Sequence, residues 1–278
     1  MKFQLKALAV AAVLAAALPA QAAIQSATAT GNGSMLLTVL DRAALISATF
    51  DLGKLYSDFN VKGNSFADSG VTASGTNFSW DLTTGDYSTA WSNFLSVATL
   101  PNTTYSVIGG DNSGTGAFTQ GFVASYKSPS IGTYTSQQAT NTALGGVFKL
   151  YSDDNSNSTL TTFQNHTTVA DGASVAVTGT AYAGGPVFAD GKLNRVGPVI
   201  FGAIGTDMGV IQVNSAASGL VPANQFVFGN GAKFNLSATG LLTYSTNAPV
   251  VAVPEADSWA MMLLGLSFMG FVARRKQA

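Results

Sequence analysis

The 278-residue sequence predicts an all-β protein, an antiparallel β-sandwich or jelly roll, flanked by an N-terminal signal helix and a C-terminal transmembrane helix. Between residues 23 and 245, apolar residues alternate with polar ones in several short segments, which is the period of half-buried strands. Turns rich in Gly and Asn separate these segments. An uncharged apolar run stands near each end of the chain.

The composition excludes several classes of protein. Only 10 % of the residues are charged, and 13 Lys and Arg against 14 Asp and Glu give a net charge of -1. The chain therefore lacks the basic surface that binds nucleic acid. There is no Cys, and His166 is the only histidine, which excludes disulfides, thiolate zinc sites and multi-histidine metal sites. We expect no cofactor and no nucleic-acid partner.

Residues 1–22 have the order of a secretory signal peptide. Lys2 and Lys6 precede an apolar run at 7–18, and Ala20 and Ala22 form a small-x-small cleavage site. As a helix the run is about 18 Å long, at about 1.5 Å per residue, too short for a hydrocarbon core of about 30 Å. We expect the general secretion machinery to export the chain and cleavage to follow Ala22.

Residues 23–245 are expected to form the β-rich extracytoplasmic domain. The candidate strands are 35–40, 45–52, 79–82, 147–151, 174–181, 199–204, 209–213 and 232–236. The strongest local hairpin signal is 226–236, around Gly229-Asn230-Gly231, because Gly and Asn tolerate the positive φ angles of tight turns. No amphipathic helix of ten or more residues is evident in this region.

Two features of this domain suggest binding. Trp91, beside polar neighbours, is expected to be exposed and is the candidate for stacking on a sugar, whereas Trp80 is expected in the core. Asp153, Asn155 and Asn157 have the 1-3-5 oxygen spacing that opens a calcium loop. That pattern then lacks its Gly and its bidentate Glu, so a turn is the favoured interpretation, with weak calcium binding as the alternative.

Residues 246–252 are expected to be a linker, and 253–278 a tail with three parts. Val253, Pro254 and Glu255 come first, and Glu255 is the only glutamate in the sequence. The apolar run 259–273 is the predicted transmembrane helix, although it is shorter than the usual span of about 17–25 residues. Interfacial Trp and cytoplasmic Lys and Arg typically anchor such a helix. These anchors are Trp259, Arg274, Arg275 and Lys276.

This order of Pro-Glu motif, apolar span and basic cluster resembles the PEP-CTERM sorting signal of Gram-negative bacteria. The resemblance implies that an exosortase, a membrane-embedded transpeptidase, recognises Val253–Glu255 and processes the tail. Ala256 stands where a second proline is common. The resemblance also implies an association with exopolysaccharide.

The expected function is therefore that of an exported, non-enzymatic protein of the cell surface or extracellular matrix, associated with exopolysaccharide or biofilm. It is expected to be anchored in the membrane by its C-terminal helix until an exosortase processes it. Two alternatives remain at this point: a carbohydrate-binding adhesin module, and a secreted hydrolase that uses Asp residues.

Overall fold

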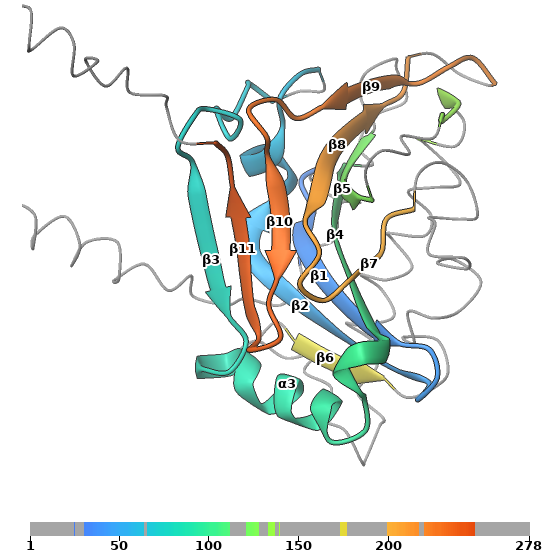
Figure 1. The fold of residues 1–278 in the computed structure, drawn as a ribbon. Coiled ribbons are helices and arrows are strands. Elements are labelled where there is room, and N and C mark those ends of the chain that lie inside the picture. Colours follow the sequence, from blue (N-terminus) through green and yellow to red (C-terminus); the bar gives the residue numbers. More distant parts are fainter. Residues whose placement is uncertain are drawn as a thin grey trace, which may run out of the picture. The chain divides into compact units, whose positions relative to one another are not determined.

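The computed structural model describes most of the predicted β domain. The described residues are 25, 31–63, 66–111, 121–127, 133–136, 139, 173–176, 199–216 and 220–247. They form one α-helix and eleven strands, with three short 3-10 turns (Figure 1). The strands are β1 (Ser34–Asp41), β2 (Ile46–Leu55), β3 (Asn77–Asp81), β4 (Thr103–Asp111), β5 (Gly121–Tyr126), β6 (Ala173–Ala176), β7 (Gly202–Ala203), β8 (Met208–Asn214), β9 (Asn224–Val227), β10 (Lys233–Leu236) and β11 (Leu241–Ser245). The helix is α3 (Ser88–Leu95), and the 3-10 turns are η1 (Tyr56–Phe59), η2 (Gly85–Tyr87) and η3 (Leu100–Asn102).

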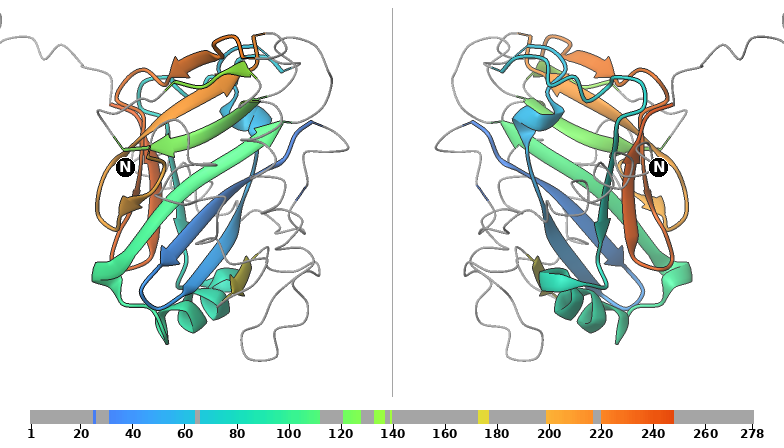
Figure 2. Two further views of the ribbon diagram at one scale, coloured as in Figure 1. Left: turned by 90° about the vertical axis from the view of Figure 1, so that its right-hand side faces the viewer. Right: turned by 90° about the vertical axis from the view of Figure 1, so that its left-hand side faces the viewer.

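The expected antiparallel β architecture is confirmed, but the strands form one continuous sheet instead of the two sheets of a sandwich. Its order is β3-β11-β10-β8-β5-β4-β1-β2-β6, with β7 added beside β4 and β9 beside β8. Strands in a sheet twist relative to their neighbours, and over many strands this twist curls the sheet. Figure 2 shows the result from two sides, with β10 and β11 facing β1 and β2 across the interior.

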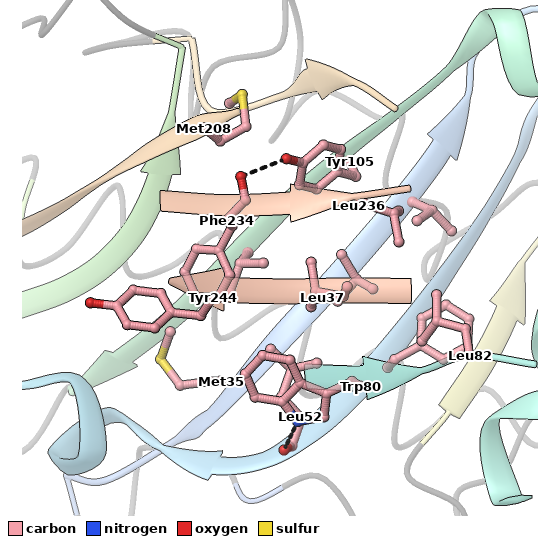
Figure 3. Close-up of a cluster of buried hydrophobic side chains, with 14 of the residues drawn as sticks. Met35, Leu37, Leu52, Trp80, Leu82, Tyr105, Met208, Phe234, Leu236 and Tyr244 are labelled. Atoms are coloured by element: carbon pink, nitrogen blue, oxygen red, sulfur yellow. Dashed lines mark hydrogen bonds between the residues drawn. The ribbon is translucent and has the colours of Figure 1, made fainter. Parts of the chain in front are cut away.

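The interior of the curled sheet holds the hydrophobic core. In β1, Met35, Leu37 and Val39 alternate into this core, as the period of a strand requires. Side chains from β3, β8, β10 and β11 meet them from the other side of the curl (Figure 3). β1 is buried along its whole length and pairs with a strand on each side, β4 and β2.

A bulge interrupts β2 near its end. Leu36 pairs with Asp51 and Ser34 pairs with Leu55, so β2 has two more residues than β1 between these pairs. Gly53 lies in this stretch with a φ of 61°, a conformation that glycine adopts at little cost. Bulges of this kind bend a strand and end its regular pairing.

The predicted hairpin at 226–236 is wrong, although its turn is tight. Asn230 and Gly231 have φ angles of 54° and 63°, but β9 and β10 do not pair with each other. β9 pairs with residues 211–214 of β8, and β10 pairs with residues 208–209 of the same strand. The Gly229-Asn230-Gly231 segment therefore interrupts a strand that continues along β8 on both sides of it. The hairpin in this region is formed by β10 and β11.

The sequence reasoning missed helix α3, which is eight residues long. Its buried residues are Ala90, Trp91 and Phe94, and it packs against β2 and β6. Their spacing places all three on one helix face.

The folded unit extends to Asn247, so the first two residues of the predicted linker belong to it. The Thr246 N–H donates to the Thr76 carbonyl at 3.0 Å, and the Gly75 N–H donates to the Asn247 carbonyl at 2.9 Å. In the described ranges no helix has the length and hydrophobicity to cross a membrane. The predicted signal helix at 1–22 and the predicted span at 259–273 lie outside those ranges.

Candidate functional site: a groove between β2 and β3

The curl of the sheet brings the edge strand β3 opposite the end of β2 without pairing them. Within the described residues, β3 pairs only with β11. β2 pairs with β6 only over residues 47–50. The Trp80 indole N–H bridges the two strands by donating to the Leu52 carbonyl at 2.7 Å (Figure 3).

A groove of about 700 Å³ lies at this junction. Its walls come from the end of β2, from β3 and from β11. The lining residues are Leu52, Gly53, Lys54, Asn77, Phe78, Ser79, Trp80, Thr243, Tyr244 and Ser245. The volume lies within the range of about 300–1,000 Å³ that is typical of ligand pockets. We call it the β2–β3 groove.

Lys54 and Phe78 form the boundary between the β2–β3 groove and a second hollow. The Lys54 ammonium lies 4.9 Å from the centre of the Phe78 ring, a cation–π contact. The ring also stacks on Tyr244, with centroids 5.8 Å apart. The second hollow has a volume of about 390 Å³ and includes Asp58 and Asp68 in its lining.

Asp51 is a buried carboxyl group on β2 directly before the groove. Its side chain accepts hydrogen bonds from the Ser34 hydroxyl at 2.6 Å and from the Gly53 N–H at 2.8 Å. Burial raises the pKa of Asp51 to about 6, and these two hydrogen bonds oppose the shift. Near neutral pH, β2 therefore carries, next to the groove, a buried carboxylate whose charge is poorly solvated.

A second polar cluster, centred on Gln212, holds the segment after β2 against β8. The Gln212 amide nitrogen lies 2.8 Å from both the Tyr56 hydroxyl and the Asn60 side-chain oxygen. Its carbonyl oxygen accepts the Val61 N–H at 2.8 Å. Burial raises the pKa of Tyr56, and the charge of Asp111 adds to this shift. These contacts satisfy buried polar groups and give the cluster a structural role.

The structure overturns the expectation that Trp91 is exposed. Its side chain is 4 % exposed and lies on α3, stacked on Phe94 with centroids 5.9 Å apart. A buried indole offers no ring face to a sugar. The expectation for Trp80 is confirmed, because its side chain is 6 % exposed in the core.

The other predicted site residues lie outside the described residues. They are Ala20, Ala22, Asp153, Asn155, Asn157, Val253, Pro254, Glu255, Trp259, Arg274, Arg275 and Lys276. Among the residues that the structure does describe, no group of three or more His, Asp or Glu side chains is placed to hold a metal ion.

Sequence reasoning missed Lys54 and Phe78, the residues that define the groove. The alternation around Trp80 indicated a strand, but no local signal shows that this strand lies at an edge. Lys54 and Phe78 come together only because the sheet curls, and the strands of that sheet are far apart in the sequence.

Comparison with known protein families finds a match at the C-terminus. Residues 252–276 match the family model of the PEP-CTERM protein-sorting motif. No curated protein and no solved structure matches the chain. The match covers the Val253–Glu255 motif, the apolar run and the basic cluster on which the resemblance rested. The chain therefore carries a PEP-CTERM protein-sorting motif, which indicates an exported protein targeted to an exosortase.

Proposed function

We propose that the chain is a non-enzymatic protein of the cell surface or extracellular matrix of a Gram-negative bacterium. In this proposal residues 1–22 direct export and are removed, and the C-terminal helix holds the chain in the membrane until an exosortase processes the tail. The β domain is then the delivered cargo, associated with exopolysaccharide. The match of residues 252–276 to the sorting motif carries the proposal.

The composition and the fold of the chain are consistent with the proposed place of the β domain in a matrix. The whole chain contains 30 Gly and no Cys, and only 10 % of its residues are charged. Its fold is stabilised by a hydrophobic core inside one curled sheet and by buried hydrogen-bond clusters such as that of Gln212. The low charge and the β fold suit a hydrated polysaccharide matrix.

The test compares the protein in cells with and without the exosortase. In exosortase-positive cells, mass spectrometry of the surface protein is expected to find a C-terminus at or near residues 253–255. In cells without the enzyme, the tail is expected to remain attached. An intact tail in both strains would contradict exosortase processing and leave a simple C-terminal anchor.

Two substitutions test whether processing by the exosortase depends on the Val253–Glu255 motif. Glu255→Gln removes the charge of the only glutamate and is expected to reduce processing strongly. Asp257→Asn removes a charge two residues further on and serves as the control, with processing close to wild type. Equal processing of the wild-type protein and both variants would show that the exosortase does not recognise the Glu255 carboxylate.

Association with exopolysaccharide has a separate test. The processed protein is expected to sediment with the matrix polysaccharide of its own cells and to be released when that polysaccharide is digested. Sedimentation that survives digestion would contradict the association without affecting the assignment of the sorting signal.

A further inference from the structure

We propose that the β2–β3 groove is an acceptor site for an extended polypeptide strand that carries a carboxylate side chain and adds to the outer edge of β3. This site is distinct from the sorting motif and does not depend on it. The occupant is a partner polypeptide that is recognised by its backbone and by one negative charge.

The edge of β3 supplies the main-chain partner. β3 pairs with β11 in unbroken register over five residues, from Asn77–Ser245 to Asp81–Leu241. In the described part of the chain no strand pairs with its other side. An edge strand presents N–H and C=O groups that can pair with an added strand, and such addition is a common mode of peptide recognition.

The end of β2 forms the opposite wall of the site. Among the described residues, β6 pairs with β2 no further than Phe50, and the bulge at Gly53 interrupts the regular pairing of β2 beyond that point. The Trp80–Leu52 hydrogen bond joins the walls through an indole side chain instead of through the backbone. The groove of about 700 Å³ lies between these walls.

The charge of Lys54 specifies the occupant further. Lys54 lines the β2–β3 groove and contacts the Phe78 ring, and among the described residues the structure gives it no ion pair. A carboxylate on the added strand would complement this charge. Lys54 and the bulge in β2 also disfavour pairing with strands of unrelated proteins, since charged side chains and bulges protect sheet edges.

The aromatic rings in the groove favour a polypeptide over a sugar chain. Lys54 lies over the Phe78 ring, which also stacks on Tyr244. Trp80 is buried. Sugars need an open ring face on which to stack, whereas strand addition needs only the edge of the backbone.

The experiment screens the purified full-length protein against a random peptide library and maps the bound peptides by amide hydrogen exchange. The selected peptides are expected to be rich in Asp or Glu. They are expected to slow exchange at Asn77–Asp81 by at least about tenfold, because added-strand hydrogen bonds protect edge amides. Two versions of a selected peptide, N-methylated at its odd-numbered or at its even-numbered residues, separate its two edges. Only one version is expected to lose binding, since only one edge of the peptide faces β3.

Charge-reversal variants test the role of Lys54. Lys54→Glu is expected to select basic peptides in place of acidic ones. Lys127→Glu, an exposed position at the end of β5, is the matched control and should keep the acidic preference. Lys54→Met removes the charge without reversal and should lose the preference while retaining the fold, which exchange of the free protein verifies.

Two results would overturn the proposal. One is a screen in which no peptide protects β3, or in which the bound peptides protect other strands. The other is protection of Asn77–Asp81 by neutral cello-oligosaccharides but not by peptides, which would make the groove a sugar site.

Discussion

Trp80 on β3 and Leu52 on β2 are joined by a hydrogen bond of 2.7 Å although their strands are not neighbours in the sheet order. The bond spans the place where the sheet curls back toward itself. It joins the two walls of the β2–β3 groove and ties the edge strand β3 to the end of β2.

Replacing Trp80 with Phe is expected to lower the free energy of unfolding by about 2–4 kcal/mol, since it removes a buried hydrogen bond and leaves a cavity. Trp91→Phe is the matched control, because Trp91 is equally buried but its indole N–H donates no hydrogen bond to any residue that the structure describes. Urea denaturation of both variants measures the difference. Equal losses would mean that the Trp80–Leu52 bond adds nothing to stability.

Asp51 is expected to make the protein less stable as the pH rises. Burial raises its pKa to about 6 from an ordinary value of 3.8, so the folded state binds more protons than the unfolded chain between these pH values. The stability that this proton contributes is present below about pH 4 and is lost as the pH rises through about 6. Asp51→Asn is expected to flatten this slope and to be more stable than wild type at pH 7 by about 1–3 kcal/mol.

Thermal denaturation from pH 4 to pH 8 measures the effect of Asp51→Asn. If the Asp51→Asn profile is parallel to that of wild type, Asp51 does not titrate in this range.

Asp41 is expected to have the opposite pH dependence. Burial raises its pKa, but hydrogen bonds from the N–H groups of Thr99, Ala44 and Ala43 outweigh that effect and hold the pKa below 3.8. The stability from this carboxylate is present above the ordinary pKa and is lost as the pH falls through the lowered one. Asp41→Asn is expected to cost about 1–3 kcal/mol at pH 7, and the difference should shrink in acid. A constant difference at all pH values would refute the assignment to charge.

Thr38 is expected to be a site where a substitution stabilises the protein. Its hydroxyl is buried in β1 and has no hydrogen-bond partner among the described residues, and burying such a group is unfavourable. Thr38→Val keeps the branched shape and should raise the free energy of unfolding by about 1 kcal/mol. Thr103→Val is the control: the Thr103 hydroxyl is equally buried but donates to the Thr99 carbonyl at 2.9 Å, so this variant should be destabilised. Destabilisation of both would indicate that the Thr38 hydroxyl has a partner in solution.

Sequence patterning predicts best the strands in which apolar and polar residues alternate within one short segment. Residues 35–40 and 209–213 lie within β1 and β8, and the buried position of Trp80 follows from the same alternation. The assembly of these strands could not be predicted, because β1 pairs with β4 and β3 with β11 across long stretches of chain. Pairing partners depend on matching faces and edges, not on the pattern within one strand.

Two local errors have definite physical causes. Gly229-Asn230-Gly231 has the φ angles of a tight turn, but the strands on both sides of it use the same neighbour, β8. Polar neighbours in the sequence predict an exposed Trp91, but in the helix Thr89 and Ser92 are exposed on the side away from the buried face that holds Trp91. The spacing of Ala90, Trp91 and Phe94 was the available sign of that helix.

The intact mass of the surface-exposed protein tests the central claim most directly, because it reports both ends of the chain at once. The account predicts a species that begins at Ala23 and lacks the C-terminal apolar run and basic cluster. A surface protein with the mass of all 278 residues would contradict it.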